Sequence, residues 1–182
     1  SFVTFFGSVL DRLLDANRFE IAGRLSSNLQ ARHIIERPPR TPNSYLVNGE
    51  FRQPSFQHGF DWVFLKPSGV TIEQLPQSSR LALTFTGSEP ENCQLLQQYV
   101  VLKPGSHCRL TWNAESDTVP KDSGIVWSLF PVTGQGAATT SKLISPDLLN
   151  HGAENASWEF TAPEQPLNLL KLQYERRLGT TR

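Results

Sequence analysis

The sequence predicts a mainly β protein, a jelly-roll β-sandwich preceded by an α-helical hairpin, and two observations support this prediction. Beyond residue 43, short runs rich in Val, Leu, Phe, Tyr and Trp recur about every ten residues, separated by Gly, Pro, Ser and Asn, as in sandwiches and barrels. Before residue 37, apolar residues instead recur with the i, i+3, i+4 spacing of amphipathic helices.

The helical part is expected over residues 2–16 and from about 19 to 35, with a break at Asn17. The stretch ERPPRTPNS, residues 36–44, then ends the helical pattern, because its prolines cannot continue a helix. We therefore expect a helical hairpin at 1–37, a proline-rich linker at 38–43 and a sandwich at 44–182. A hairpin of this size rarely buries its apolar face alone, so it either caps the sandwich or ends a helical repeat array.

Strands are expected near 44–47, 60–65, 69–75, 80–86, 94–102, 106–115, 124–131, 140–145, 157–162 and 167–176, with a turn of helix within 145–153. Alternation along these runs places each tryptophan with apolar neighbours. The four residues predicted to lie in the core on this ground are Trp62, Trp112, Trp127 and Trp158. Phe60 and Phe64 are expected on the same inner face as Trp62.

Composition excludes several classes of protein. The chain has 182 residues, 17 of them basic and 17 acidic, so it lacks the basic surplus of a nucleic-acid or anionic-lipid binder. No apolar run reaches the ~20 residues of a membrane-spanning helix. The first residues lack the basic start of a signal peptide, and the chain begins with serine and contains no methionine. We therefore expect a fragment of a longer protein.

The two cysteines, Cys93 and Cys108, are expected to be free. If the runs on either side of Pro104 form a hairpin, the two residues are offset by about seven positions, on the order of 23 Å. A disulfide requires Cα atoms within about 7 Å. Cys108, which alternates with apolar residues, is expected to be a buried thiol.

Two polar stripes lie opposite the predicted core and supply the candidate binding residues. One comprises His107, Arg109, Asn113 and Glu115, and the other Lys171, Gln173, Glu175 and Arg177. The ordinary interpretation of such a stripe is a solvated sheet face, and the functional alternative is a groove that hydrogen-bonds hydroxyl groups. The residues expected to bind a sugar are Gln98, Arg109, Asn113, Glu115 and Gln173.

Motifs for catalysis or metal binding are missing from the sequence. It has no helical histidine pair, no Cys-x-x-Cys and no Gly-x-Ser-x-Gly, so we expect neither an enzyme nor a cofactor. Paired carboxylates for glycoside hydrolysis stay open, with the candidates Asp61, Glu115, Asp117 and Glu175. Asp117 and Asp122 are also possible calcium ligands, although loop aspartates more often form turns.

Several short motifs follow one another in a specific order, in the segments LVNGEFRQPSFQHGFDWVF, QLLQQYVVLKPGSHCRLTWNAES, DSGIVWSLF and LLKLQYERRLGTTR. This order resembles a bacterial family of galactose-binding-like jelly rolls, similar to carbohydrate-binding modules of the CBM4/9/22 kind. In such domains the Asn-Gly-x-Phe segment begins the sandwich and the Pro-Gly turn closes a central hairpin. The domains often follow tetratricopeptide-type helical repeats, and their closing strand, which contains a tryptophan, has no counterpart after Arg182.

The resemblance implies a non-catalytic module that binds a polysaccharide or glycan, with the cell envelope or periplasm as the favoured compartment. It carries over no ligand-binding residues. Two alternatives remain open: a protein–protein interaction module attached to helical repeats, and a structural cap without a ligand.

Overall fold

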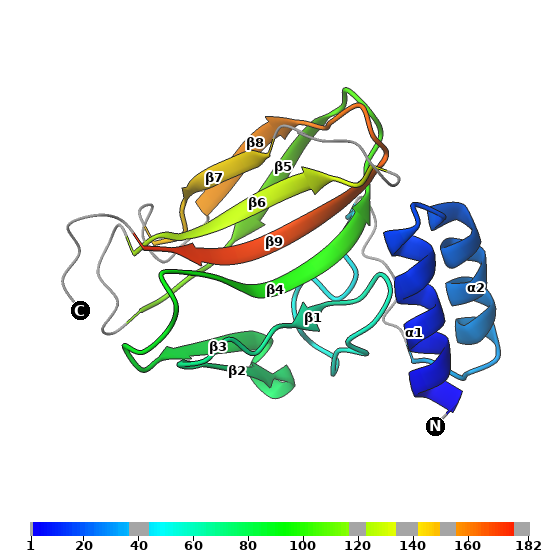
Figure 1. Ribbon diagram of the computed structural model, residues 1–182, viewed down its shortest axis with the longest axis horizontal. Coiled ribbons are helices and arrows are strands. Elements are labelled where there is room, and N and C mark those ends of the chain that lie inside the picture. The colour runs from blue at the N-terminus through cyan, green and yellow to red at the C-terminus, as the bar shows by residue number, and fades with distance from the viewer. Residues whose placement is uncertain (1, 37–43, 117–122, 134–141, 150–155, 177–182) are drawn as a thin grey trace.

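The computed structural model describes residues 2–36, 44–116, 123–133, 142–149 and 156–176. Helices α1 (Phe2–Asp15) and α2 (Phe19–Ala31) form an N-terminal pair, and the rest of the described chain is mainly β (Figure 1). The break predicted between the helices is confirmed, because Asn17 has a positive φ of 56°. The second helix ends earlier than predicted, and His33, with a φ of 54°, turns the chain away just beyond it.

The strands form one larger sheet and two separate antiparallel pairs. The larger sheet has the order β1-β4-β9-β6-β7, and the pairs are β2-β3 and β5-β8. Neighbouring strands of the larger sheet are all antiparallel. The strands span Val63–Phe64 (β1), Val70–Leu75 (β2), Arg80–Phe85 (β3), Asn92–Val101 (β4), His107–Trp112 (β5), Ile125–Pro131 (β6), Leu143–Asp147 (β7), Ala156–Thr161 (β8) and Leu167–Glu175 (β9), and the short 3-10 helix η1 spans Pro76–Ser78.

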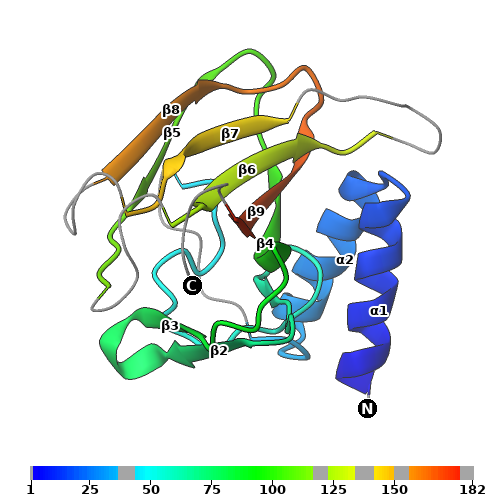
Figure 2. The same ribbon diagram turned by 60° about the vertical axis from the view of Figure 1, so that its left-hand side comes forward.

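The main core lies between the larger sheet and the β5–β8 pair. Strand β8 runs beside the edge strand β7 (Figures 1 and 2). Leu110 and Trp158, which are directly paired across β5 and β8, pack in one cluster with Trp127 of β6 and Leu172 of β9. The predicted core positions of the tryptophans are confirmed for three buried rings, and Trp112 is half-buried against the same cluster.

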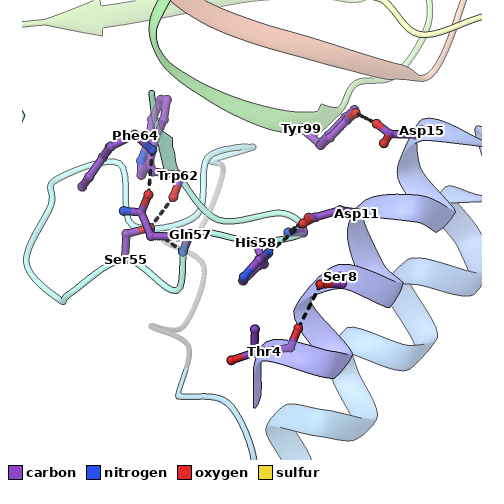
Figure 3. Close-up of polar contacts among 11 residues, drawn as sticks. Thr4, Ser8, Asp11, Asp15, Ser55, Gln57, His58, Trp62, Phe64 and Tyr99 are labelled. Atoms are coloured by element: carbon purple, nitrogen blue, oxygen red, sulfur yellow. Dashed lines mark hydrogen bonds and ion pairs between the residues drawn. The ribbon is translucent and has the colours of Figure 1, made fainter. Parts of the chain in front are cut away.

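The helical pair packs against the other face of the larger sheet, at one end. Its apolar residues share a second cluster with Leu167 of β9 and with Tyr99 and Val101 of β4. Figure 3 shows side chains of α1 directed at the β body. The carboxylate of Asp11 accepts a hydrogen bond from Gly59 N at 2.7 Å, and its other oxygen lies 2.7 Å from His58 Nδ1.

The segment LVNGEF, residues 46–51, is a turn-rich loop in the structure, and the strand predicted at 44–47 is absent. Asn48 has a φ of 50°, and Phe51 N donates to Asn48 O at 3.0 Å. Trp62 Nε1 also donates to Asn48 O, at 3.1 Å. The loop is therefore fixed against the core by side chains from elsewhere in the chain.

Four further local predictions needed correction. Of the strand expected at 60–65 only β1 forms, and Phe60 joins the helix-side cluster instead of the core around Trp62. Strands β4 and β5 do not form a hairpin about the Pro-Gly turn, because β4 pairs with β1 and β9 whereas β5 pairs with β8. The start of the stretch expected to form a helical turn, residues 145–147, belongs to β7. Both cysteines are free, as predicted, but they lie in different sheets and Cys108 is only half-buried.

Candidate functional site

The face of the larger sheet turned away from the main core, which we call the outer face, is only partly covered. In β9 the residues Leu170 and Leu172 point into the core, so Lys171 and Gln173, which alternate with them, point outward. The helical pair covers the outer face at the end where Leu167 lies. The remaining part carries the outer-face cluster, defined as Gln94, Gln97, Ser128, Phe130, Lys142, Lys171, Gln173 and Glu175.

Three strands bring these side chains together through their register. Gln94 of β4 lies opposite Gln173, and Gln97 of β4 lies opposite Lys171. On the other side of β9, Ser128 of β6 also lies opposite Lys171. An irregularity at Leu95 puts one extra residue into β4, which is why two glutamines three positions apart share a face.

A continuous set of hydrogen bonds joins four polar members of the cluster, Lys142, Glu175, Gln173 and Ser128. Lys142 Nζ donates to Glu175 Oε1 at 2.6 Å, and Gln173 Nε2 donates to the same oxygen. Ser128 Oγ donates to Gln173 Oε1 at 2.8 Å. Because Ser128 and Gln173 are buried, this network holds the more exposed Lys142 and Glu175 in place.

Lys171 is the most unusual charged group of the cluster. Its Nζ lies 4.7 Å from the centroid of the Phe130 ring, and Lys142 Nζ lies 5.6 Å from the same centroid. An aromatic ring attracts ammonium groups, so Phe130 gathers both lysines. Burial lowers the pKa of Lys171 below its ordinary value, and the nearby charge of Lys142 lowers this pKa further.

A shallow hollow of about 440 Å³ adjoins this network. Gln94, Lys142, Gln173 and Glu175 line it, together with residues at the start of β4. Its volume is within the range of small-molecule sites in proteins. The lining of the hollow includes amide groups, one carboxylate and one ammonium group.

The start of β6 fixes the rim of this hollow. Gly124, with a φ of 82°, approaches β9 so closely that a Cβ there would lie 1.9 Å from Glu175 O. Glu175 N donates to Gly124 O at 2.9 Å, and Gly124 N donates to the buried carboxylate of Asp147 at 2.6 Å. Only glycine fits this approach and this dihedral angle.

The structure separates the five residues predicted to bind a sugar. Gln173 belongs to the outer-face cluster, and Gln98, buried on the opposite face of the same sheet, bonds both the N–H and the C=O of Val47. The other three, Arg109, Asn113 and Glu115, lie on or just after β5, across the core from the cluster, and are exposed.

The exposed β5 residues already have polar partners. Arg109 Nε donates to Glu159 Oε1 at 2.8 Å across the β5–β8 pair. Glu115 lies 3.6 Å from Arg80 Nη1. Asn113 also has an interaction partner. The exposed face of the β5–β8 pair therefore has the character of an ordinary solvated sheet face.

The carboxylates considered for hydrolysis lie on separate elements. Asp61 is buried and accepts hydrogen bonds from Phe56 N and Trp62 N, both at 2.8 Å, within its own loop. Glu115 and Glu175 are paired with Arg80 and Lys142. Asp117, Asp122 and Arg177 lie outside the described residues.

The described part of the chain offers neither a metal site nor a membrane-spanning helix. No group of three His, Cys, Asp or Glu side chains there is placed to hold a metal ion. Neither α1 nor α2 has the length and hydrophobicity needed to cross a bilayer.

No family model matches this chain, and no curated protein or solved structure is detectably similar to it.

The sequence indicated the β9 part of the cluster but missed the rest. Alternation placed Lys171, Gln173 and Glu175 on one stripe, whereas no pattern in the sequence predicted a role for Phe130 or Lys142 in a binding site. The signal for Phe130 was available, because it alternates with Val126 and Ser128 and falls opposite the apolar set of β6. No local signal brings Lys142 to Glu175, since that contact depends on how β7 is placed beside β6.

Proposed function

We propose that the chain is a non-catalytic, carbohydrate-binding jelly-roll module, and that the outer-face cluster is its ligand site. The observation that supports this most directly is the hollow lined by the amides of Gln94 and Gln173 together with Lys142 and Glu175. Gln97 adds a further neutral amide on the same face of the sheet. Amide and charged groups of this kind donate and accept hydrogen bonds with vicinal sugar hydroxyls.

The fold agrees with this proposal at the level of its layers. A five-stranded antiparallel sheet faces a second layer of strands across an apolar core, which is compatible with a jelly roll. We also propose that the helical pair is the end of a tetratricopeptide-type repeat array.

The chemistry of the rim favours binding over catalysis. Cys93 lies at the hollow, and burial, followed by the charge of Glu89, raises the pKa of its thiol. A thiol with a raised pKa stays protonated and is a weak nucleophile. Glu175 already accepts hydrogen bonds from both Lys142 and Gln173, so one of its carboxylate oxygens is engaged within the cluster.

The proposal is tested by native gel electrophoresis of the chain through a panel of soluble polysaccharides, with thermal melting as a second readout. Gln97→Ala, a half-buried residue of the cluster, is expected to weaken retention by about three- to tenfold, as loss of one hydrogen bond does. The matched control is Arg109→Ala, on the opposite layer, which should leave retention unchanged. Retention lost in Arg109→Ala and kept in Gln97→Ala would move the site to β5. Absence of retention by every polymer would refute the proposed function.

A second candidate function, protein–protein interaction, is favoured by a separate observation on the helical pair. Phe2 and Phe5 of α1 are 78% and 62% exposed, and Ile21 of α2 is 47% exposed. Exposed apolar side chains on two neighbouring helices, two of them aromatic and one turn apart on α1, are typical of contact surfaces. The simplest occupant is the same face of a second copy. Sedimentation equilibrium should then detect a dimer that the double substitution Phe2→Ser and Phe5→Ser abolishes, whereas a monomer at all concentrations would refute self-association.

A further inference from the structure

The charges of the outer-face cluster do not balance. Lys142 and Lys171 contribute two positive charges beside the Phe130 ring, and the cluster contains one carboxylate, Glu175. That carboxylate pairs with Lys142 at 2.6 Å. Among the described residues, none of the ion pairs includes Lys171.

The surroundings of Lys171 make this imbalance costly. The side chain is half-buried between Gln97 of β4 and Ser128 of β6, which are neutral. A charged ammonium group that is partly withdrawn from water loses hydration and needs a compensating negative charge. The lowered pKa of Lys171 reports the same cost, since burial and the Lys142 charge both disfavour the protonated form.

Alternative compensation within the cluster is limited. The π-face of Phe130 attracts Lys171, but an aromatic ring carries no net charge and stabilises an ammonium group only partly. Glu175 already accepts from both Lys142 and Gln173. The position next to Lys171 therefore suits a group that brings one negative charge with it.

We infer that the sugar bound at the outer-face cluster carries a carboxylate, as a uronic acid does, and that this carboxylate pairs with Lys171. The inference rests on the proposed glycan-binding function and adds the substrate class. The neutral glutamines contact the hydroxyl groups of the same sugar, and Lys171 selects for its charge.

The test compares polygalacturonate with its fully methyl-esterified form, because the two polymers differ only at the carboxyl group, which is an anion in the first and a neutral methyl ester in the second. Retention of the chain in native gels should be at least about tenfold stronger with the free acid, as expected for a charge-assisted hydrogen bond. Lys171→Met keeps the aliphatic stem over Phe130 and should abolish this difference, whereas Lys171→Arg should preserve it. Lys103→Met, the same substitution on the exposed β4–β5 connection, is the control and should behave as wild type.

Each outcome separates the inference from the function on which it rests. Equal retention by both polymers, unchanged in Lys171→Met, would overturn the acidic-sugar inference and leave glycan binding supported. Stronger retention by dextran sulfate that survives Lys171→Met would also overturn it, because the selectivity would then be general attraction to polyanions. No retention by any charged or neutral polymer would overturn both. Melting curves of the two Lys171 variants check that each is folded.

Discussion

The Gln98 side chain allows a sharp test of whether a polar residue of the sheet stabilises the fold or binds a ligand. Gln98 is 1% exposed, and its amide closes two hydrogen bonds with the backbone of Val47, accepting from N at 3.2 Å and donating to O at 2.8 Å. Gln98→Met keeps a similar volume but can form neither bond. Both groups of Val47, itself 1% exposed, would then be buried without these partners.

The expected cost follows from those two backbone groups. An unsatisfied buried N–H or C=O costs about 1–3 kcal/mol, so losing both partners should destabilise the chain by about 3 kcal/mol. For a chain of this size that corresponds to a fall in Tm of roughly 6–12 °C. Urea unfolding and thermal melting by circular dichroism measure it. The control Gln94→Met, on an exposed residue of the same strand, should stay within about 0.5 kcal/mol of wild type.

The same variant must keep its ligand affinity below its melting temperature, because Gln98 faces the core and not the outer-face cluster. A Gln98→Met chain that melts within about 2 °C of wild type would refute the proposed role of the two Val47 bonds. A stable variant that loses glycan binding would restore Gln98 as a ligand residue.

Three further predictions concern the backbone and the titratable groups. Gly124→Ala should lower the free energy of unfolding by more than about 3 kcal/mol, because its Cβ would meet Glu175 O. Gly87→Ala, at a similar φ of 83° but in open space, should lower it by about 1–2 kcal/mol. Equal losses in urea unfolding would contradict the steric role of Gly124. Burial and then the hydrogen bond to a carboxylate raise the pKa of Tyr99, so its stabilisation is complete below the unfolded pKa of about 10 and declines as pH rises through the folded pKa. The stability gap between wild type and Tyr99→Phe should therefore stay constant up to about pH 9 and shrink above about pH 10, and a gap that does not change above about pH 10 would contradict the assignment. Because the pKa of Lys171 is lowered in the free protein, binding of a carboxylate should raise this pKa and cause proton uptake at alkaline pH, below the ordinary lysine pKa. Calorimetry in two buffers of different ionisation enthalpy detects such uptake, and Lys171→Met should show none.

The local elements were predictable because their signals are local. The apolar spacing of residues 2–16 predicted α1, and alternation along 106–115 gave the faces of β5 with Leu110 inward and Arg109 outward. The pairing of the strands was harder to predict from the sequence. The sequence suggested that β4 and β5 form a hairpin about Pro104, but β4 instead pairs with β9, near the other end of the described chain. The chain passes from the larger sheet to the β5–β8 pair between β4 and β5, and the Pro-Gly turn gives no local signal for this change of layer.

The candidate site was predicted in part for the same reason. A period of two found the stripe on β9 that includes Gln173, because β9 is regular. In β4 the extra residue at Leu95 shifts the period, so Gln94 and Gln97 share a face although simple alternation separates them. Gln98 was assigned to binding because a glutamine in mid-strand looks available, and its engagement by Val47 depends on a loop far away in sequence.

A glycan bound to the outer face of the larger sheet would be located by chemical-shift mapping, with two-dimensional ¹⁵N NMR of the chain titrated with an oligosaccharide from a polymer that retains it. The largest shifts should fall on the side-chain amides of Gln94 and Gln97 and on the backbone of β6 and β9 around Ser128 and Gln173. Shifts concentrated on β5 and β8, around Arg109 and Glu159, with the outer face unaffected, would contradict this location of the ligand.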